Sequence, residues 1–238
     1  MHISEKMKLL LLSSIVLLFA SCTAEEELKE NRGILFSIQT RTNNSTTEYT
    51  NLQPGEQVGI YIVGRTGAGA ETSLKPTGNI FDNLLLSCRP EGILKPQNET
   101  YYPLSISYVD LYAYAPYDAA TEIDSNRLLS FFVQQDQSSS SLIRKSDLLW
   151  SKKLNVLTTS VSAPYLTFNH CLSKLIINLK AGVGVTLDNT AIKVTGTKIG
   201  AKLNMIDGTL AEAQGDVVEI TPMAHAGKFE YEAIIIPQ

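Results

Sequence analysis

Apolar and polar residues alternate in many short runs along this chain, and no long stretch has the spacing of an amphipathic helix. The clearest run is Val109 to Ala115. Its apolar residues Val109, Leu111, Ala113 and Ala115 share one face, and Asp110, Tyr112 and Tyr114 share the other. Because successive side chains of a strand point to opposite sides, this pattern predicts a β-strand with one buried face.

Similar runs of β-branched and aromatic residues recur, each closed by Gly, Pro, Asn or Asp. They are Ile34–Thr40, Gln57–Val63, Leu128–Gln134, Asp147–Trp150, Tyr165–Phe168, Leu172–Lys180, Ala191–Ile199, Val217–Thr221 and Phe229–Ile236. The Ser-rich segment Ser138–Ser141 is typical of an exposed loop. Many short strands separated by turns predict an all-β fold, an antiparallel sandwich or barrel with long loops, and not a parallel βαβ sheet.

The N-terminus has the pattern of a lipoprotein signal peptide. Lys6 and Lys8 precede an apolar run, Leu9–Phe19, which is too short to span a bilayer, and the small residues Ala20 and Ser21 lead into Cys22. Cleavage before Cys22 would leave its thiol to carry acyl chains such as palmitate, and these would anchor the protein in the outer membrane. The alternative is an ordinary signal peptide in which Cys22 is incidental.

The residues after Cys22 are acidic, and the chain as a whole is mildly acidic. Glu25, Glu26 and Glu27 form a solvated tether that resembles the surface-export signal of some Gram-negative lipoproteins. The 238 residues carry a formal charge of −4, or about −5 without residues 1–21, which contain one Glu and two Lys. Without a basic cluster, this composition argues against nucleic-acid binding.

No catalytic or metal-binding motif is present, which predicts a protein that is not an enzyme and has no cofactor or metal. His170 and His225 are the histidines that would remain after signal cleavage. For His170 a backbone hydrogen bond is favoured over a role as catalytic base, and His225 is expected to be solvated. The segment GRTGAG at Gly64–Gly69 resembles a phosphate-binding loop only in part, because the third glycine of the spacing Gly-x-Gly-x-x-Gly is absent and no helix start follows. This favours a plain hairpin loop. Four dispersed aspartates, Asp110, Asp118, Asp124 and Asp136, identify no glycosidase pair.

Two groups of residues leave alternatives open. Cys88 and Cys171 both lie beside apolar residues, so they form either a disulfide outside the cytoplasm or two buried free thiols. The tyrosines either stack on sugars or pack across strands in the core, and packing is the commoner cause of such a pattern. They are Tyr101, Tyr102, Tyr108, Tyr112, Tyr114 and Tyr117.

Several segments taken together resemble the fimbrillin family of lipoprotein pilus subunits, in its N-terminal region. They are the lipid-attachment sequence at Cys22, ILFSIQTRT, YVDLYAYAPY at Tyr108–Tyr117, SDLLW, FNHCLSKLIINL at Phe168–Leu179, and YEAIIIPQ. The resemblance implies a transthyretin-like β-sandwich over residues 34–238, after a signal peptide at residues 1–21 and a tether at residues 22–33. Members of this family usually have a second, similar domain, which we expect to be missing from this chain. We therefore expect a truncated product, a single-domain member, or a member whose donor strand is Phe229–Ile236.

The resemblance also implies assembly by β-strand addition. An Arg-specific protease removes the lipidated N-terminus with the first strand, and a strand of the next subunit fills the exposed groove. Mapped onto this chain, Ile34, Phe36 and Ile38 would face the groove, and Arg41 would be the cleavage site, with Arg32 as the second choice. The partners implied are other pilus subunits and the outer membrane, and the function implied is a pilus subunit or a lipid-retaining anchor that supports cell adhesion. The alternative is a surface lipoprotein that binds glycans or host ligands without polymerising.

Overall fold

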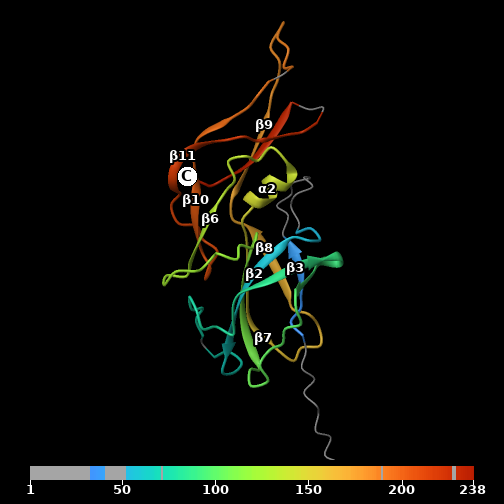
Figure 1. Ribbon diagram of the computed structural model, residues 1–238, viewed down its shortest axis with the longest axis vertical. Coiled ribbons are helices and arrows are strands. Elements are labelled where there is room, and N and C mark those ends of the chain that lie inside the picture. The colour runs from blue at the N-terminus through green and yellow to red at the C-terminus, as the bar shows by residue number, and fades with distance from the viewer. Residues whose placement is uncertain (1–32, 41–51, 71, 189, 227–228) are drawn as a thin grey trace, which may run out of the picture. The chain divides into compact units, whose positions relative to one another are not determined.

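The computed structural model describes residues 33–40, 52–70, 72–188, 190–226 and 229–238, all within one compact unit, Arg32–Gln238. Strands dominate these residues, and seven of them form a sheet that closes on itself as a barrel (Figure 1). In order around the barrel, the strands are β1 (Phe36–Thr40), β4 (Ile93–Pro96), β3 (Phe81–Arg89), β2 (Gln57–Arg65), β5 (Tyr108–Ala115), β7 (Leu149–Leu157) and β8 (Tyr165–His170).

The barrel is closed by β1, which lies between β4 and β8. It pairs antiparallel with β4, where Phe36 is opposite Leu94, and parallel with β8, where Ser37 to Thr40 lie opposite Tyr165 to Phe168. The other neighbouring strands of the barrel pair antiparallel. The closure therefore depends on a single short strand that comes from the start of the described chain.

Two three-stranded sheets and a short helix complete the described fold. One sheet has the order β11–β10–β6 and the other the order β12–β13–β9. The bounds are β6 (Leu128–Phe132), β10 (Val194–Asn204), β11 (Gln214–Ile220), β9 (Ser173–Asn178), β12 (Met223–Ala224), β13 (Glu230–Ile235), the helix α2 (Ser140–Ser146) and a 3-10 turn η1 (Pro90–Gly92).

The apolar side chains form two main cores. The first fills the barrel and contains Phe36, Ile60, Leu111 and Phe168 among others. The second lies between the outer side of β2 and β5 and the strands β6, β10 and β13, and Tyr61, Tyr112 and Tyr114 belong to it. The barrel wall is therefore buried on both of its sides along β2 and β5, because the additional sheets cover its outer side.

The alternation in β5 correctly predicted a strand and its barrel-facing side, but the prediction that only one face is buried is wrong. Tyr112, Tyr114 and even Asp110 are buried on the opposite face. In a sequence pattern, tyrosine and aspartate count as polar residues. A phenol ring nevertheless packs well in a core, and a carboxylate can be buried when it forms an ion pair, as Asp110 does with Arg65.

The predicted all-β class is confirmed, and most predicted strands lie within a few residues of observed ones. In detail the main sheet closes into a barrel, since β1 hydrogen-bonds to strands on both of its sides. The strands β3 and β4 were not anticipated. The sequence of β3, FDNLLLSCR, has no regular alternation of apolar and polar residues, so it lacks the two-residue period that marks a strand. In the structure several of its side chains are only half buried.

The segment Ser138–Ser141 is not wholly a loop. Ser140 and Ser141 begin α2, and the Ser139 side chain caps this helix by accepting a hydrogen bond from the Leu142 backbone N–H at 3.4 Å. A serine followed by a mixed polar and apolar segment is a helix start signal, which the serine-rich composition concealed. Among the described residues, no helix has the length and apolar character needed to cross a bilayer.

Candidate functional site

Cys22, Arg41 and Arg32 lie outside the described residues, so the predicted lipidation and cleavage sites have no structural description here. The three residues predicted to face a groove are described. Ile34 and Phe36 are buried in the barrel core, and Ile38 is partly buried and packs against it. The side chains of this segment therefore point into the barrel at every second residue.

The walls around β1 are apolar and fully buried. Leu94 of β4, together with Leu166 and Phe168 of β8, shares the barrel core with Phe36. The segment is fixed by backbone hydrogen bonds as well, since Ile34 N–H donates to Thr100 O at 2.7 Å and Ser37 N–H donates to Pro164 O at 3.2 Å. Without β1, the facing edges of β4 and β8 and an apolar groove between them would be exposed to solvent.

The segment Phe229–Ile236, which the sequence suggested as a donor strand, is part of the fold. Its strand β13 is central in its sheet, with β12 on one side and β9 on the other. Ala233 and Ile236 are buried in the second core. Because both edges of β13 are already hydrogen-bonded, this segment is not a free donor in this structure.

Both histidines lie close to carboxylates, which the sequence did not predict. The Nδ1 of His170 lies 2.8 Å from Asp147 Oδ1, so a carboxylate side chain is its partner at this nitrogen. The Nε2 of His225 lies 3.5 Å from Oε2 of the buried Glu232, so His225 is not simply solvated. Lys174 Nζ is 2.5 Å from the same Glu232 oxygen, which offsets the buried negative charge. No group of three or more His, Cys, Asp or Glu suited to a metal ion occurs in the described residues.

The two cysteines of the described region are free thiols, which settles the alternative that the sequence left open. Cys88 belongs to the barrel core, whereas Cys171 packs against the second core. Burial, reinforced by the nearby Asp147 carboxylate, raises the pKa of Cys171 to about 12. Both thiols thus pack among apolar side chains, and the raised pKa of Cys171 disfavours its reactive thiolate form at neutral pH.

Tyr112 and Tyr114 are buried in the second core, so packing between strands explains these two tyrosines. The Tyr114 hydroxyl donates to Asn83 Oδ1 at 2.9 Å and lies 3.2 Å from Asp118 O. Burial raises the pKa of Tyr114 to about 12. Its hydroxyl thus remains protonated and fixes the start of the loop that follows β5.

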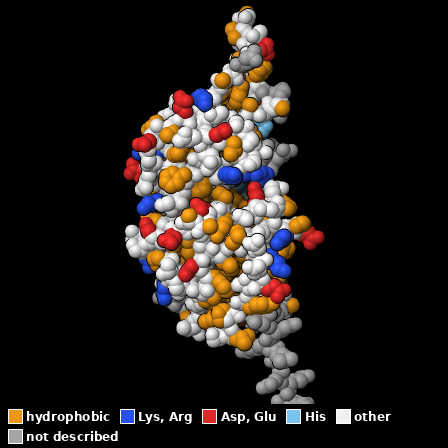
Figure 2. Space-filling model, viewed as in Figure 1, with side chains coloured by type: hydrophobic (Ala, Val, Ile, Leu, Met, Phe, Trp, Pro, Cys, Tyr) orange, Lys and Arg blue, Asp and Glu red, His pale blue; other side chains and the backbone are white. Residues whose placement is uncertain are grey.

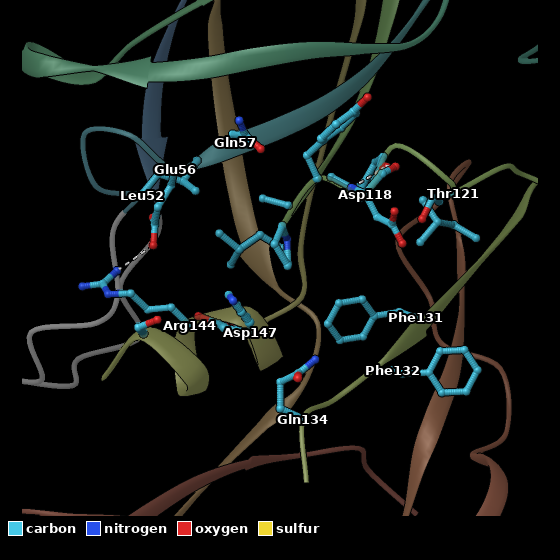
Figure 3. A pocket seen from close by; sticks show the side chains of 18 of the residues that line it. Leu52, Glu56, Gln57, Asp118, Thr121, Phe131, Phe132, Gln134, Arg144 and Asp147 are labelled. Carbon is cyan, nitrogen blue, oxygen red and sulfur yellow. Dashed lines mark hydrogen bonds and ion pairs between the residues drawn. The ribbon is translucent and has the colours of Figure 1, made fainter. Parts of the chain in front are cut away.

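That loop borders a cavity of about 650 Å³ between the end of β5, β6, α2 and the segment before β2 (Figure 3). Its floor is apolar and buried, and it includes Leu52, Ala115, Leu129, Phe131 and Leu149. Its rim is polar and includes Glu56, Asp118, Gln134, Arg144 and Asp147. No local sequence motif marks this cavity, because its lining comes from four segments that only the fold brings together.

The fold is shared with several solved structures, each less than 20% identical to this chain. A candidate cell adhesion protein from Bacteroides ovatus superposes with a TM-score of 0.63 at 17% identity, covering 87% of this chain and 79% of that one. A second, from Bacteroides uniformis, gives 0.58 at 19% identity, covering 86% and 74%. A fimbrial protein from Bacteroides ovatus gives 0.50 at 19% identity, and the chain spans 42% of its length.

No curated protein matches the chain significantly in sequence. The family model described as fimbrillin-like, in contrast, matches residues 40–238, which is most of the chain and includes every strand after β1. The resemblance seen in the sequence is thereby confirmed by an independent comparison. This chain belongs to the fimbrillin-like family.

Proposed function

We propose that this chain is a surface lipoprotein of fimbrial type, a subunit or anchor of a pilus that assembles by β-strand addition and supports cell adhesion. Family membership and the fold shared with a fimbrial protein and cell adhesion proteins support the general role. The signal pattern ending at Cys22 supports attachment to the outer membrane through lipid.

The observation that carries the assembly mechanism is the position of β1. It is a terminal strand that closes the barrel, yet it is hydrogen-bonded by only five residues and is followed at once by Arg41 in the sequence. Cleavage after Arg41 would separate β1 from the rest of the chain, whereas cleavage after Arg32 would leave it attached. The vacated groove would accept another strand with apolar residues at alternate positions, because Ile34, Phe36 and Ile38 are spaced in this way.

Two roles follow from the fate of β1. If it is removed, the chain polymerises as a subunit. If it stays, the chain keeps its lipid and its closed barrel, and it acts as an anchor or accessory protein at the base of a pilus.

The N-terminus and intact mass of the protein recovered from outer membranes distinguish these roles. An N-terminus at Thr42 identifies a subunit, and Arg41→Ala should then abolish both the cleavage and any heat-labile ladder of polymers on a gel. The matched control Arg32→Ala should leave both unchanged.

An acylated Cys22 on an otherwise intact chain identifies an anchor. A chain that begins at another residue, with neither lipid on Cys22 nor a start at Thr42, would contradict the proposed function in both forms.

A further inference from the structure

The cavity beside β5 and β6 has the properties of a ligand site. Its volume of about 650 Å³ lies within the range of roughly 300–1,000 Å³ that is typical of small-molecule sites. Its residues come from the end of β5, β6, α2 and the segment around Glu56, and no residue of β1 lines it. Strand addition at β1 therefore does not explain it.

The chemistry of the lining is divided between floor and rim. The floor presents apolar surface, and Figure 3 shows the Phe131 ring directed toward the middle of the cavity. The rim presents hydrogen-bonding groups, and the Gln134 side chain also points inward (Figure 3). A fitting ligand needs one apolar face and many polar groups around its edge. A sugar ring has this character, with C–H groups on its faces and hydroxyls at its perimeter.

The rim carries charged side chains of both signs, and several of them have partners within the protein. Arg144 Nη1 lies 3.3 Å from Glu56 Oε1, and Asp147 Oδ1 lies 2.8 Å from His170 Nδ1. One further carboxylate, Asp118, and one further ammonium group, Lys145, complete the charged rim. Acidic and basic side chains are likewise interspersed on the visible face of the molecule (Figure 2). A rim with carboxylates as well as basic groups, and no excess of basic groups, favours an uncharged ligand over a phosphate, a sulfate or a strongly acidic polymer.

Two rim groups have hydrogen-bonding capacity to spare. Asp118 Oδ1 accepts from Ala120 N–H at 2.9 Å, and within the described part of the chain no hydrogen bond uses Oδ2. Among the described residues, none forms a hydrogen bond with the side-chain amide of Gln134. The backbone N–H of Gln134 donates to Ser146 Oγ at 2.9 Å. A carboxylate oxygen and an amide together offer both an acceptor and a donor to neighbouring hydroxyls.

The backbones that carry these two side chains are held in place before any ligand arrives. The Tyr114 hydroxyl fixes the Asp118 backbone, and the Ser146 hydroxyl fixes that of Gln134. Pre-organisation of this kind lowers the entropy lost on binding. We propose that the cavity is a binding site for a short neutral oligosaccharide, with Phe131 under a sugar ring and Asp118 and Gln134 on its hydroxyls. This proposal is independent of strand addition and holds for a subunit or an anchor.

The test uses the full chain in a detergent without a sugar headgroup, applied to an array of neutral oligosaccharides of two to four sugars. The best-retained compound is then titrated by calorimetry. Loss of one hydrogen-bonding group should raise the dissociation constant about tenfold, so we expect this for both Gln134→Ala and Asp118→Asn. The matched controls Gln135→Ala and Asp188→Asn are exposed and do not line the cavity. They should bind like the unaltered chain.

The proposal is overturned if no neutral oligosaccharide is retained, or if retention is unaffected by both cavity variants. Retention of only sulfated, sialylated or peptide probes would also overturn it, because the ligand class would then be wrong. Thermal unfolding of each variant must match that of the controls, and the conservative pair Gln134→Glu and Asp118→Glu replaces any variant that fails to fold. Failure here leaves the N-terminal measurement above unaffected, so the two proposals fail separately.

Discussion

The ring of Tyr114 lies directly over Gly59, its cross-strand partner on β2. A methyl group added at Gly59 would come within 2.3 Å of Tyr114 Cε1 and 2.6 Å of Asn83 Oδ1. The glycine is thus required for close approach of the ring and not for an unusual backbone angle. The same ring joins the second core to the loop that carries Asp118.

Gly59→Ala should therefore lower the free energy of unfolding by about 1–3 kcal/mol, the usual cost of overpacking a core. Tyr114 and Asn83 must move to admit the methyl group, and their mutual hydrogen bond weakens. Urea unfolding measures the effect. The control is Gly67→Ala, which has no neighbour within 4 Å of the added methyl group. Equal stability of the two variants would contradict the close approach.

The buried ion pair between Arg65 and Asp110 gives a second prediction. Arg65 Nη1 lies 2.5 Å from Asp110 Oδ1, and the same oxygen accepts the Asn155 backbone N–H at 2.7 Å. Asp110→Asn keeps the shape but leaves the guanidinium without its counter-charge, which should cost about 3–5 kcal/mol of unfolding free energy. The surface pair of Lys202 and Asp124, at 3.7 Å, serves as the control. Lys202→Met should cost less than about 1 kcal/mol, and a comparable loss in both variants would refute the argument.

Stability should fall in alkaline solution. Burial raises the pKa of Cys171 from 9.0 to about 12 and that of Tyr114 from 10.0 to about 12. The folded state thus holds protons that the unfolded state releases. This stabilisation is complete below pH 9 and is lost as the pH rises toward 12, by at most about 1.4 kcal/mol per pH unit for each group.

Urea unfolding at several values between pH 8 and pH 10.5 tests this dependence. The Cys171→Ala variant should show a shallower decrease over that interval, because one of the linked protons is absent. If the unaltered chain is equally stable across the interval, or if the two slopes coincide, the assignment to Cys171 is wrong.

The contribution of β1 to the barrel gives a fourth prediction. Phe36 is 0% exposed, whereas its neighbour Leu35 is 41% exposed on the opposite side of the strand. Phe36→Ala should cost about 3–5 kcal/mol, as is usual when a buried phenylalanine is truncated. Leu35→Ala should cost less than about 1 kcal/mol.

Thermal unfolding of the uncleaved chain compares the two variants. If β1 is the strand that closes the barrel, only Phe36→Ala should also speed proteolysis near the N-terminus. A similar loss of stability in both variants would show that β1 does not depend on its inward-facing residue.

Features that rest on local chemistry could be predicted from the sequence alone. Alternation in Val109–Ala115 identified a strand, and the Lys6-to-Cys22 pattern predicts a lipoprotein signal that remains a prediction. The family resemblance was also readable from short segments, and the match to residues 40–238 confirmed it. These features could be predicted because side-chain periodicity and signal composition are properties of neighbouring residues.

The covered faces of the strands and the contacts between distant residues became visible only in the folded structure. It placed Tyr114 over Gly59, paired β1 in parallel with β8, and assembled the cavity around Phe131 and Gln134. The one-face prediction for β5 failed because alternation reports a difference in polarity between two faces and not whether a second layer covers the more polar one. Contacts between residues far apart in the chain depend on the packing of whole sheets, which no local pattern encodes.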